Sequence, residues 1–274
     1  MMKIFVMASG RSGTKYLSEL FQHNVGRCVA KHEPYLSMFG KPIYWYQQGD
    51  IERIRQRFSL KKKLIKHYRA QVYIETNHAF LKSFSDVALE AFPDAKLIHL
   101  IRNPLEVAKS QYHRPVWIGE PDSLWFRLFH TYVGEDNKRY LDWTLTGNEQ
   151  IFKDISLNLT RYQQLLVQWI ELENRAMHLL ETYHKHCDYF ALETPKDLNN
   201  EEKMLEMFSF FGITLKHHDI VFQGKKNIAK IPTRVTTWDK HQLHELIDHT
   251  PARYLEIFHQ NPYNSVAWGE LLQK

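Results

Sequence analysis

A short loop near the start of the chain has the residue types of an anion-binding site. Residues 9–15 read Ser-Gly-Arg-Ser-Gly-Thr-Lys, between an apolar run at residues 4–7 and the helical spacing of Tyr16, Leu17 and Leu20. A loop of small residues between a strand and a helix directs backbone N–H groups at one point, which suits phosphate or sulfate. The residues expected to hold such an anion are Gly10, Arg11, Ser12, Gly13, Thr14 and Lys15.

A second cation, Arg102, stands at the end of the clearest buried strand of the chain, residues 95–101. Asn103 and Pro104 follow, and these residue types suit the cap and the first turn of a helix. Arginine presents a planar fork of N–H donors that matches phosphate oxygens, and it stays charged at any working pH. The sequence therefore predicts two separate anion sites, one at Arg11 and one at Arg102.

These residues are placed by a pattern of strand, loop and helix that recurs three times. Strands are expected at residues 4–7, 27–30, 71–75 and 95–101, and this pattern predicts an α/β fold in which helices cover a parallel sheet. Ligands of such sheets bind beyond the carboxyl ends of the strands. The polar groups expected to converge at that edge are Arg11, Glu33, His78 and Arg102.

The rest of the chain is expected to surround this sheet as one domain over residues 1–274, without repeats or linkers. Residues 36–50 and 114–158 are rich in aromatic residues, which predicts a substrate-side loop and a lid or acceptor-binding insertion. Residues 51–70 have the spacing of an amphipathic helix with a solvated basic face. Acceptor-side insertions are thus expected near residues 36–70 and 114–158. Further elements are expected as a helix at 162–183, a strand at 189–192 and a helix that Gly212 ends.

The composition favours a soluble protein with a large core and no metal. Of 274 residues, 43% are hydrophobic, and 36 Lys and Arg against 31 Asp and Glu give a net charge of +5, which suits an anionic ligand. The two cysteines, Cys28 and Cys187, form neither a disulfide framework nor a metal-ligand set. Because neither a signal-peptide pattern nor a transmembrane run of about 18 apolar residues is visible, we expect a cytoplasmic location.

A Walker A loop that binds ATP or GTP is the first alternative for the loop after residue 7. That motif requires Gly, four residues, and then Gly-Lys-Ser or Gly-Lys-Thr. Here Ala8 stands at the first glycine position, and Thr14 follows Gly13 where the motif requires lysine. The sequence therefore disfavours a P-loop kinase of small molecules.

Residues 9–17 resemble the 5′-phosphosulfate loop of sulfotransferases that use 3′-phosphoadenosine 5′-phosphosulfate, in the version with Arg-Ser-Gly-Thr. Residues 97–104 together with Ser110 resemble the family's 3′-phosphate motif, in which a strand-end arginine and a helix serine hold that phosphate. Residues 190–198 and 208–212 are similar to motifs of the family's C-terminal half. The stretches that carry the resemblance, in the family's order, are residues 3–35, 72–113 and 160–213.

The resemblance implies a P-loop NTPase-like sulfotransferase fold with a central parallel sheet flanked by helices. It implies transfer of a sulfuryl group from that donor to a hydroxyl or amine, with release of adenosine 3′,5′-bisphosphate. Such a reaction asks the protein to align the reactants and to stabilise charge on the leaving phosphate, roles that fall to Arg11, the loop amides and Thr14. A family loop that closes over the 3′-phosphate implies a role for Lys225 and Lys226.

The same resemblance offers two candidates for the general base that accepts the proton of the attacking group. Residues 31–35, Lys-His-Glu-Pro-Tyr, resemble a segment of polysaccharide-modifying and several bacterial sulfotransferases, and this points to Glu33. Residues 76–78, Thr-Asn-His, resemble the Lys-Thr-His of cytosolic small-molecule sulfotransferases, and this points to His78. Glu33 is the preferred candidate, because the match at His78 is looser.

The acceptor stays open at this stage. The aromatic stretches suit a sugar ring, a phenol or a lipid-like alcohol equally, because aromatic faces bury all three. An alternative from another functional class is a non-catalytic module that binds an anion or polysaccharide through the basic helix at residues 51–70.

Overall fold

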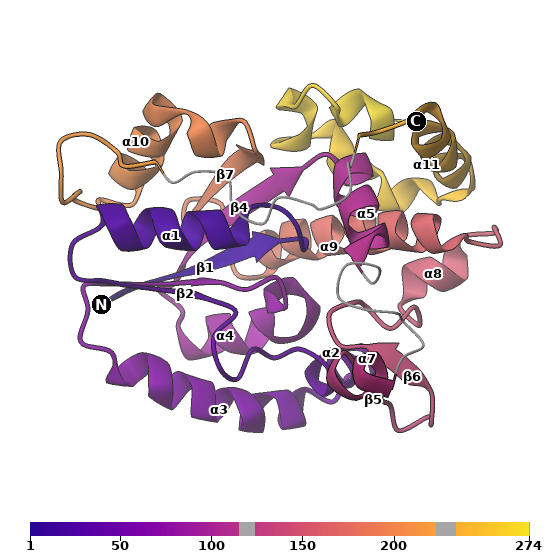
Figure 1. Cartoon of the computed structure of the whole chain (residues 1–274), viewed down its shortest axis with the longest axis horizontal. Coiled ribbons are helices and arrows are strands. Elements are labelled where there is room, and N and C mark those ends of the chain that lie inside the picture. Colours follow the sequence, from indigo (N-terminus) through magenta and orange to yellow (C-terminus); the bar gives the residue numbers. More distant parts are fainter. Residues whose placement is uncertain (115–123, 223–233, 274) are drawn as a thin grey trace.

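A computed structural model describes residues 1–114, 124–222 and 234–273 of the chain. Five strands form one sheet in the order β2-β3-β1-β4-β7, and each neighbouring pair is parallel. The strands are β1 (Met2–Ala8), β2 (Cys28–His32), β3 (Val72–Thr76), β4 (Lys96–Arg102) and β7 (Tyr189–Thr194). Figure 1 shows helices on both sides of this sheet, which confirms the predicted α/β fold.

Side chains of β1 alternate between the two faces of the sheet, and each face has its own core. Ile4 and Val6 pack in the cluster formed with α1 (Thr14–Asn24) and α10 (Glu201–Phe210). Phe5 packs in the cluster on the opposite face, where α4 (Ser85–Ala91) and α9 (Arg161–Thr182) lie (Figure 1). A strand buried on both faces reads as a continuous apolar run, as residues 4–7 do.

The remaining elements lie around this framework. The other helices are α2 (Lys41–Gln47), α3 (Ile51–His67), the π-helix η1 (Phe80–Phe84), α5 (Pro104–Tyr112), α7 (Leu124–Phe129), α8 (Gln150–Asp154) and α11 (Thr237–His249). Short 3₁₀ turns are η2 (Asp197–Asn199), η3 (Ala252–Tyr254), η4 (Glu256–His259), η5 (Tyr263–Ser265) and η6 (Gly269–Leu272). Strands β5 (Thr131–Val133) and β6 (Arg139–Leu141) form an antiparallel hairpin. No helix in the described ranges is long and apolar enough to cross a membrane.

The topology places a switch point between β1 and β4, which are neighbours in the sheet. From β1 the chain continues to the β2 side, whereas from β4 it continues to the β7 side. Ligands of open parallel sheets bind at such a switch point, outside the carboxyl ends of the strands. The loop at residues 9–13 follows β1 there, and Arg102 ends β4 there.

Helix α5 begins as its sequence predicts. The Asn103 side chain accepts a hydrogen bond from the backbone N–H of Leu105, and Pro104 occupies the first turn. Lys109 of α5 forms an ion pair with Asp239 of α11, with Nζ 2.9 Å from Oδ2. These contacts hold α5, and thus Ser110, in a defined place beside the ends of β1 and β4.

Two sequence-based expectations about the outer segments need correction. Residues 36–50 are not only a loop, since α2 occupies Lys41–Gln47 with Pro42 in its first turn. The predicted helix at 51–70 exists as α3, but its basic face is not wholly solvated, because Lys61 is 2% exposed. The Lys61 Nζ lies 2.7 Å from the Glu75 Oε1, so this lysine neutralises a carboxylate that β3 carries into the core.

Candidate active site

The loop at residues 9–13 has the geometry of an anion cradle at the start of α1. The first N–H groups of a helix have no partner within the helix, so they are available to a ligand at the N-terminus. Ser12 is fully buried and its hydroxyl lies 2.9 Å from that of Ser9, so these two side chains brace the loop. Arg11 and Gly13 adopt left-handed backbone conformations, with φ of 74° and 88°. A left-handed arginine is uncommon, and such strain gathers at functional sites.

Replacing Gly13 by alanine should lower the free energy of unfolding by about 1–2 kcal/mol or more, because an L-residue resists the left-handed conformation. The new Cβ would also lie 2.7 Å from Leu198 Cδ1. Urea unfolding measures the loss. Gly26→Ala is the matched control, because a Cβ there meets only Lys216 Cγ at 3.8 Å, and equal stability of the two variants would contradict the prediction.

The two predicted anion sites are joined by direct contacts. The Arg11 Nε donates to the Ser110 Oγ at 3.0 Å, and the Arg102 Nη1 donates to the Arg11 carbonyl oxygen at 2.7 Å. Burial, followed by the neighbouring cations Arg114 and Arg102, lowers the pKa of Arg11. Like charges gathered in this way favour an anion between them. The structure therefore brings Arg11, Arg102 and Ser110 into direct contact beside the loop.

Arg102 also has a partner that the sequence analysis missed. Its Nε and Nη2 donate to the Glu106 Oε2 at 3.0 and 2.8 Å. An anion that binds Arg102 must therefore share the guanidinium with this carboxylate or displace it. The four-residue spacing of Arg102 and Glu106 across the start of α5 was the available signal.

The two candidate bases lie next to each other at the ends of β2 and β3. The Glu33 Oε1 lies 3.3 Å from the His78 Nε2, and the Lys82 Nζ lies 3.0 Å from the His78 Nδ1. The His32 Nε2 is 3.8 Å from the same Glu33 oxygen. Glu33 and His78 thus form one unit with Lys82, a residue that the sequence analysis missed although it follows His78 by four positions.

Lys82 determines how His78 is protonated. It is 1% exposed, and its Nζ also donates to the backbone carbonyl of Trp143. A lysine ammonium can only donate, so a protonated Lys82 makes the His78 Nδ1 an acceptor and leaves the proton on Nε2, which faces Glu33. Burial, followed by the Lys82 charge, lowers the pKa of His78 well below its usual value, so the ring is neutral at pH 7.

Lys82 should also impose a pH dependence on stability. Burial, followed by Arg114, lowers its pKa from 10.5 to about 7, so the unfolded chain binds more protons than the folded chain between these pH values. The free energy of unfolding contributed by this group therefore rises with pH across that window. The charged groups that act on Lys82 are Arg114, Glu33, Arg175 and Asp142.

Replacing Lys82 by methionine should remove this rise. Between pH 7 and 9 the difference in unfolding free energy between the parent and Lys82→Met should change by about 2 kcal/mol, and the variant should be the more stable of the two near pH 6. Urea unfolding at pH 6, 7, 8 and 9 measures it. The exposed Lys63→Met is the control, and parallel pH profiles for the parent and Lys82→Met would contradict the prediction.

Glu33 lies in a strained loop that buried donors hold in place. Left-handed φ values recur at Glu33, Leu36 and Met38. The carbonyl oxygens of residues 36, 37 and 38 accept hydrogen bonds from Lys61 (3.1 Å), Asn77 (2.7 Å) and Ser83 (2.7 Å), respectively. The strain persists because these contacts over-determine the backbone of the segment that follows Glu33.

Four further predicted site residues are Thr14, Lys15, Lys225 and Lys226. Thr14 is buried at the start of α1 and Lys15 is half-buried beside it. Lys225 and Lys226 lie outside the residues that the structure describes. Across the described ranges, no group of three or more His, Cys, Asp or Glu is arranged to hold a metal ion.

The chain is similar to known proteins in both sequence profile and fold. A sequence profile described as "Sulfotransferase domain" matches residues 2–231. The crystal structure of a sulfotransferase from Alicyclobacillus acidocaldarius aligns with 95% of this chain and 97% of its own, at 15% identity and a TM-score of 0.51, which shows a shared fold. The sulfotransferase domain from the curacin biosynthetic pathway aligns over 90% and 98%, at 11% identity and a TM-score of 0.47. Among curated proteins, none matches this chain significantly in sequence.

Proposed function

The chain belongs to the sulfotransferase domain family, and we propose that it moves a sulfuryl group from 3′-phosphoadenosine 5′-phosphosulfate to a hydroxyl or amine. In this proposal Glu33 is the general base. Arg11 and the loop at residues 10–15 hold the phosphosulfate, and Arg102 with Ser110 holds the 3′-phosphate. Lys225 and Lys226 are proposed to add charge at that phosphate.

One observation supports the proposal most strongly, namely that the anion loop packs against the unit formed by Glu33, His78 and Lys82. A Cβ added to Gly10 would lie 3.5 Å from the His78 ring, so the backbone of the loop lies directly beside the imidazole. The Glu33 charge acts on both Arg11 and Lys82. A group bound at the loop is thus adjacent to a carboxylate that can accept a proton.

Glu33 suits the role of base better than His78 because of access. The Glu33 side chain is 30% exposed, whereas the His78 side chain is 5% exposed and both of its ring nitrogens face protein groups. His78 is therefore proposed as a positioning residue, whose Nε2 proton orients the Glu33 carboxylate. This arrangement combines the two candidates that the sequence left as alternatives.

The chemistry follows from these positions. The acceptor oxygen or nitrogen forms a bond to sulfur while the bond from sulfur to the 5′-phosphate oxygen breaks, and the electron pair stays with that oxygen. Glu33 takes the acceptor proton, and Arg11 with the loop N–H groups stabilises the charge left on the phosphate. General-base catalysis contributes about 100- to 10,000-fold to such a step.

A donor-binding comparison tests the proposal against a P-loop kinase. Adenosine 3′,5′-bisphosphate should raise the thermal unfolding temperature of the full chain, because a ligand that binds only the folded state stabilises it. ATP with magnesium should have a much smaller effect, since the loop lacks the Walker lysine. Stabilisation by ATP with magnesium and none by the bisphosphate would overturn the proposal in favour of a kinase.

The wider setting is part of the same proposal. We propose a single domain over residues 1–274, with the acceptor contacted by segments near residues 36–70 and 114–158. A cytoplasmic location is also proposed, because Cys28 and Cys187 are both free thiols.

A further inference from the structure

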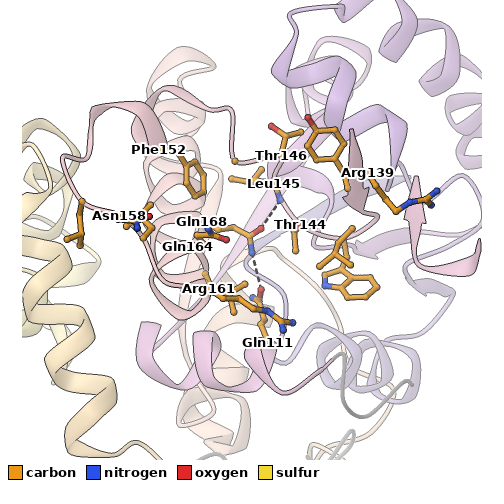
Figure 2. A pocket seen from close by; sticks show the side chains of 17 residues that line it. Gln111, Arg139, Thr144, Leu145, Thr146, Phe152, Asn158, Arg161, Gln164 and Gln168 are labelled. Carbon is orange, nitrogen blue, oxygen red and sulfur yellow. Dashed lines mark hydrogen bonds between the residues drawn. The ribbon is translucent and has the colours of Figure 1, made fainter. Parts of the chain in front are cut away.

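A cavity of about 510 Å³ lies beside the candidate active site. Its lining comes from the end of α5, the segment at residues 139–147, α8, residues 157–159 and the first half of α9, as Figure 2 shows. None of its lining residues belongs to the anion loop at residues 9–15, and neither Arg102 nor Ser110 lines it. The cavity is therefore separate from the residues proposed to hold the nucleotide.

A chain of buried amides connects the cavity to the anion loop. The Gln111 Nε2 donates to the Gly10 carbonyl oxygen at 3.2 Å, and the Gln168 Nε2 donates to the Gln111 Oε1 at 3.0 Å. The Gln168 Oε1 in turn accepts from the Leu145 N–H at 2.7 Å. Figure 2 shows the last two hydrogen bonds at the cavity wall. The wall is thus hydrogen-bonded to the anion loop at Gly10.

Trp143 connects the same cavity to Lys82, which contacts His78. It lines the cavity, and its carbonyl oxygen accepts the hydrogen bond from Lys82. The Arg114 guanidinium lies over its ring, 4.4 Å from the centroid. One lining residue, Gln111, thus separates the cavity from Gly10, and another, Trp143, separates it from Lys82. An acceptor held in the cavity would reach Glu33 by extending past these two residues.

The charges of the lining select among acceptors. Two arginines, Arg139 and Arg161, line the cavity, and no Asp, Glu, Lys or His does. The Arg139 Nη1 is engaged with the Arg127 carbonyl and the Thr131 hydroxyl. Arg161 lies 5.4 Å from the centre of the Tyr112 ring and forms no ion pair within the described ranges. Its guanidinium is available to a ligand anion, and guanidinium binds carboxylate or sulfate through paired N–H donors.

The uncharged residues of the lining also bear on the chemical class of the acceptor. Amide side chains such as Asn158 and Gln164 share the cavity with apolar ones such as Leu157 and Leu165. Asn158 and Gln164 are both exposed, so their amides are accessible to the hydroxyl groups of a ligand. A ring with hydroxyl groups can form hydrogen bonds with these amides and pack its faces on the leucines, so the lining suits a hydroxylated ring.

We propose that this cavity is the acceptor site, and that it takes a hydroxylated ring compound with an anionic group that Arg161 binds. The inference rests on the proposed function, since it assigns the acceptor class of that same reaction. A volume of about 510 Å³ suits one or two rings. Acidic sugars and aromatic hydroxy acids share this chemistry, and the test separates them.

The test measures sulfate transfer by mass spectrometry for two matched pairs of acceptors with the full chain. One pair is methyl glucuronide and methyl glucoside, and the other is 4-hydroxyphenylacetate and its amide. In at least one pair the acid should have a kcat/KM about tenfold above that of its neutral partner. Transfer to the glucuronide alone identifies an acidic sugar, and transfer to the phenol acid alone identifies an aromatic acid.

Arg161 variants test the assignment of the anion contact. Arg161→Gln should reduce the preference for the acid to within about threefold, whereas Arg161→Lys should keep most of it. The exposed Arg69→Gln serves as the control. Equal rates for acid and neutral partners in the parent, or a preference that Arg161→Gln leaves unchanged, would overturn the proposal.

The two proposals fail in distinguishable ways. Adenosine 3′,5′-bisphosphate binding without transfer to any of the four acceptors would overturn the acceptor class and leave the proposed function standing. Absence of bisphosphate binding would overturn the proposed function itself.

Discussion

Replacing Glu33 by glutamine should lower kcat for sulfate transfer by about 100- to 10,000-fold, with little change in stability. Glutamine keeps the size of the side chain, but its amide cannot take the proton of the acceptor. Adenosine 3′,5′-bisphosphate should bind the variant as it binds the parent protein, because Glu33 lies at the end of β2 and the proposed nucleotide contacts come from other loops. Initial rates by mass spectrometry and bisphosphate binding by calorimetry measure the two effects.

Substitution of the neighbouring His78 distinguishes the two candidate bases most clearly. His78→Gln should reduce kcat by only about tenfold, because glutamine retains an N–H donor toward Glu33 and the base itself is unchanged. Glu202→Gln, at an exposed position of α10, is the control for loss of a carboxylate. A large loss in His78→Gln together with near-parental activity in Glu33→Gln would reverse the assignment of the base.

Arg11→Met should weaken bisphosphate binding and reduce kcat by about 100- to 1,000-fold, which is the usual effect of losing one donor that stabilises transition-state charge. The variant loses the guanidinium beside the proposed leaving phosphate and the hydrogen bond to Ser110. Calorimetry with the bisphosphate separates the binding effect from the effect on kcat.

Arg27→Met is a matched control for this change. Arg27 is also a left-handed residue, with φ of 47°, but it is exposed at the turn before β2. The two variants therefore share the same substitution and the same kind of backbone strain. Unchanged bisphosphate affinity in Arg11→Met, or an equal loss in Arg27→Met, would remove Arg11 from the donor site.

The sequence predicted those features that local patterns determine. The apolar run at residues 4–7 and the small residues after it predicted β1, its loop and the start of α1. The Asn103-Pro104 pair predicted the start of α5, and the structure confirms it. These features depend on neighbours within a few residues, so periodicity and capping chemistry are enough to find them.

Contacts that depend on the order of strands in the sheet could not be predicted from the sequence. The contact between Arg11 and Ser110 exists because β1 and β4 are adjacent in the sheet, and nothing in the periodicity of either segment specifies this. The burial of Lys61 likewise depends on Glu75, which a different element presents. The same holds for Gln111, whose partners are Gly10 and Gln168.

Lys82 is the clearest case of a missed residue. It stands four positions after His78, but its segment is a π-helix whose spacing differs from that of an α-helix. In the structure, η1 is followed directly by α4, so residues 80–91 do not form one continuous α-helix. The lysine was therefore not recognised as part of the site.

Transfer of labelled sulfate from 3′-phosphoadenosine 5′-phosphosulfate tests the central claim most directly. The full chain is incubated with the ³⁵S-labelled donor and a panel of sugars, phenols and alcohols with and without acidic groups. Labelled acceptor and adenosine 3′,5′-bisphosphate should form in equal amounts, and Glu33→Gln should form almost none. No labelled acceptor from the entire panel, or equal product from the parent and Glu33→Gln, would contradict the account.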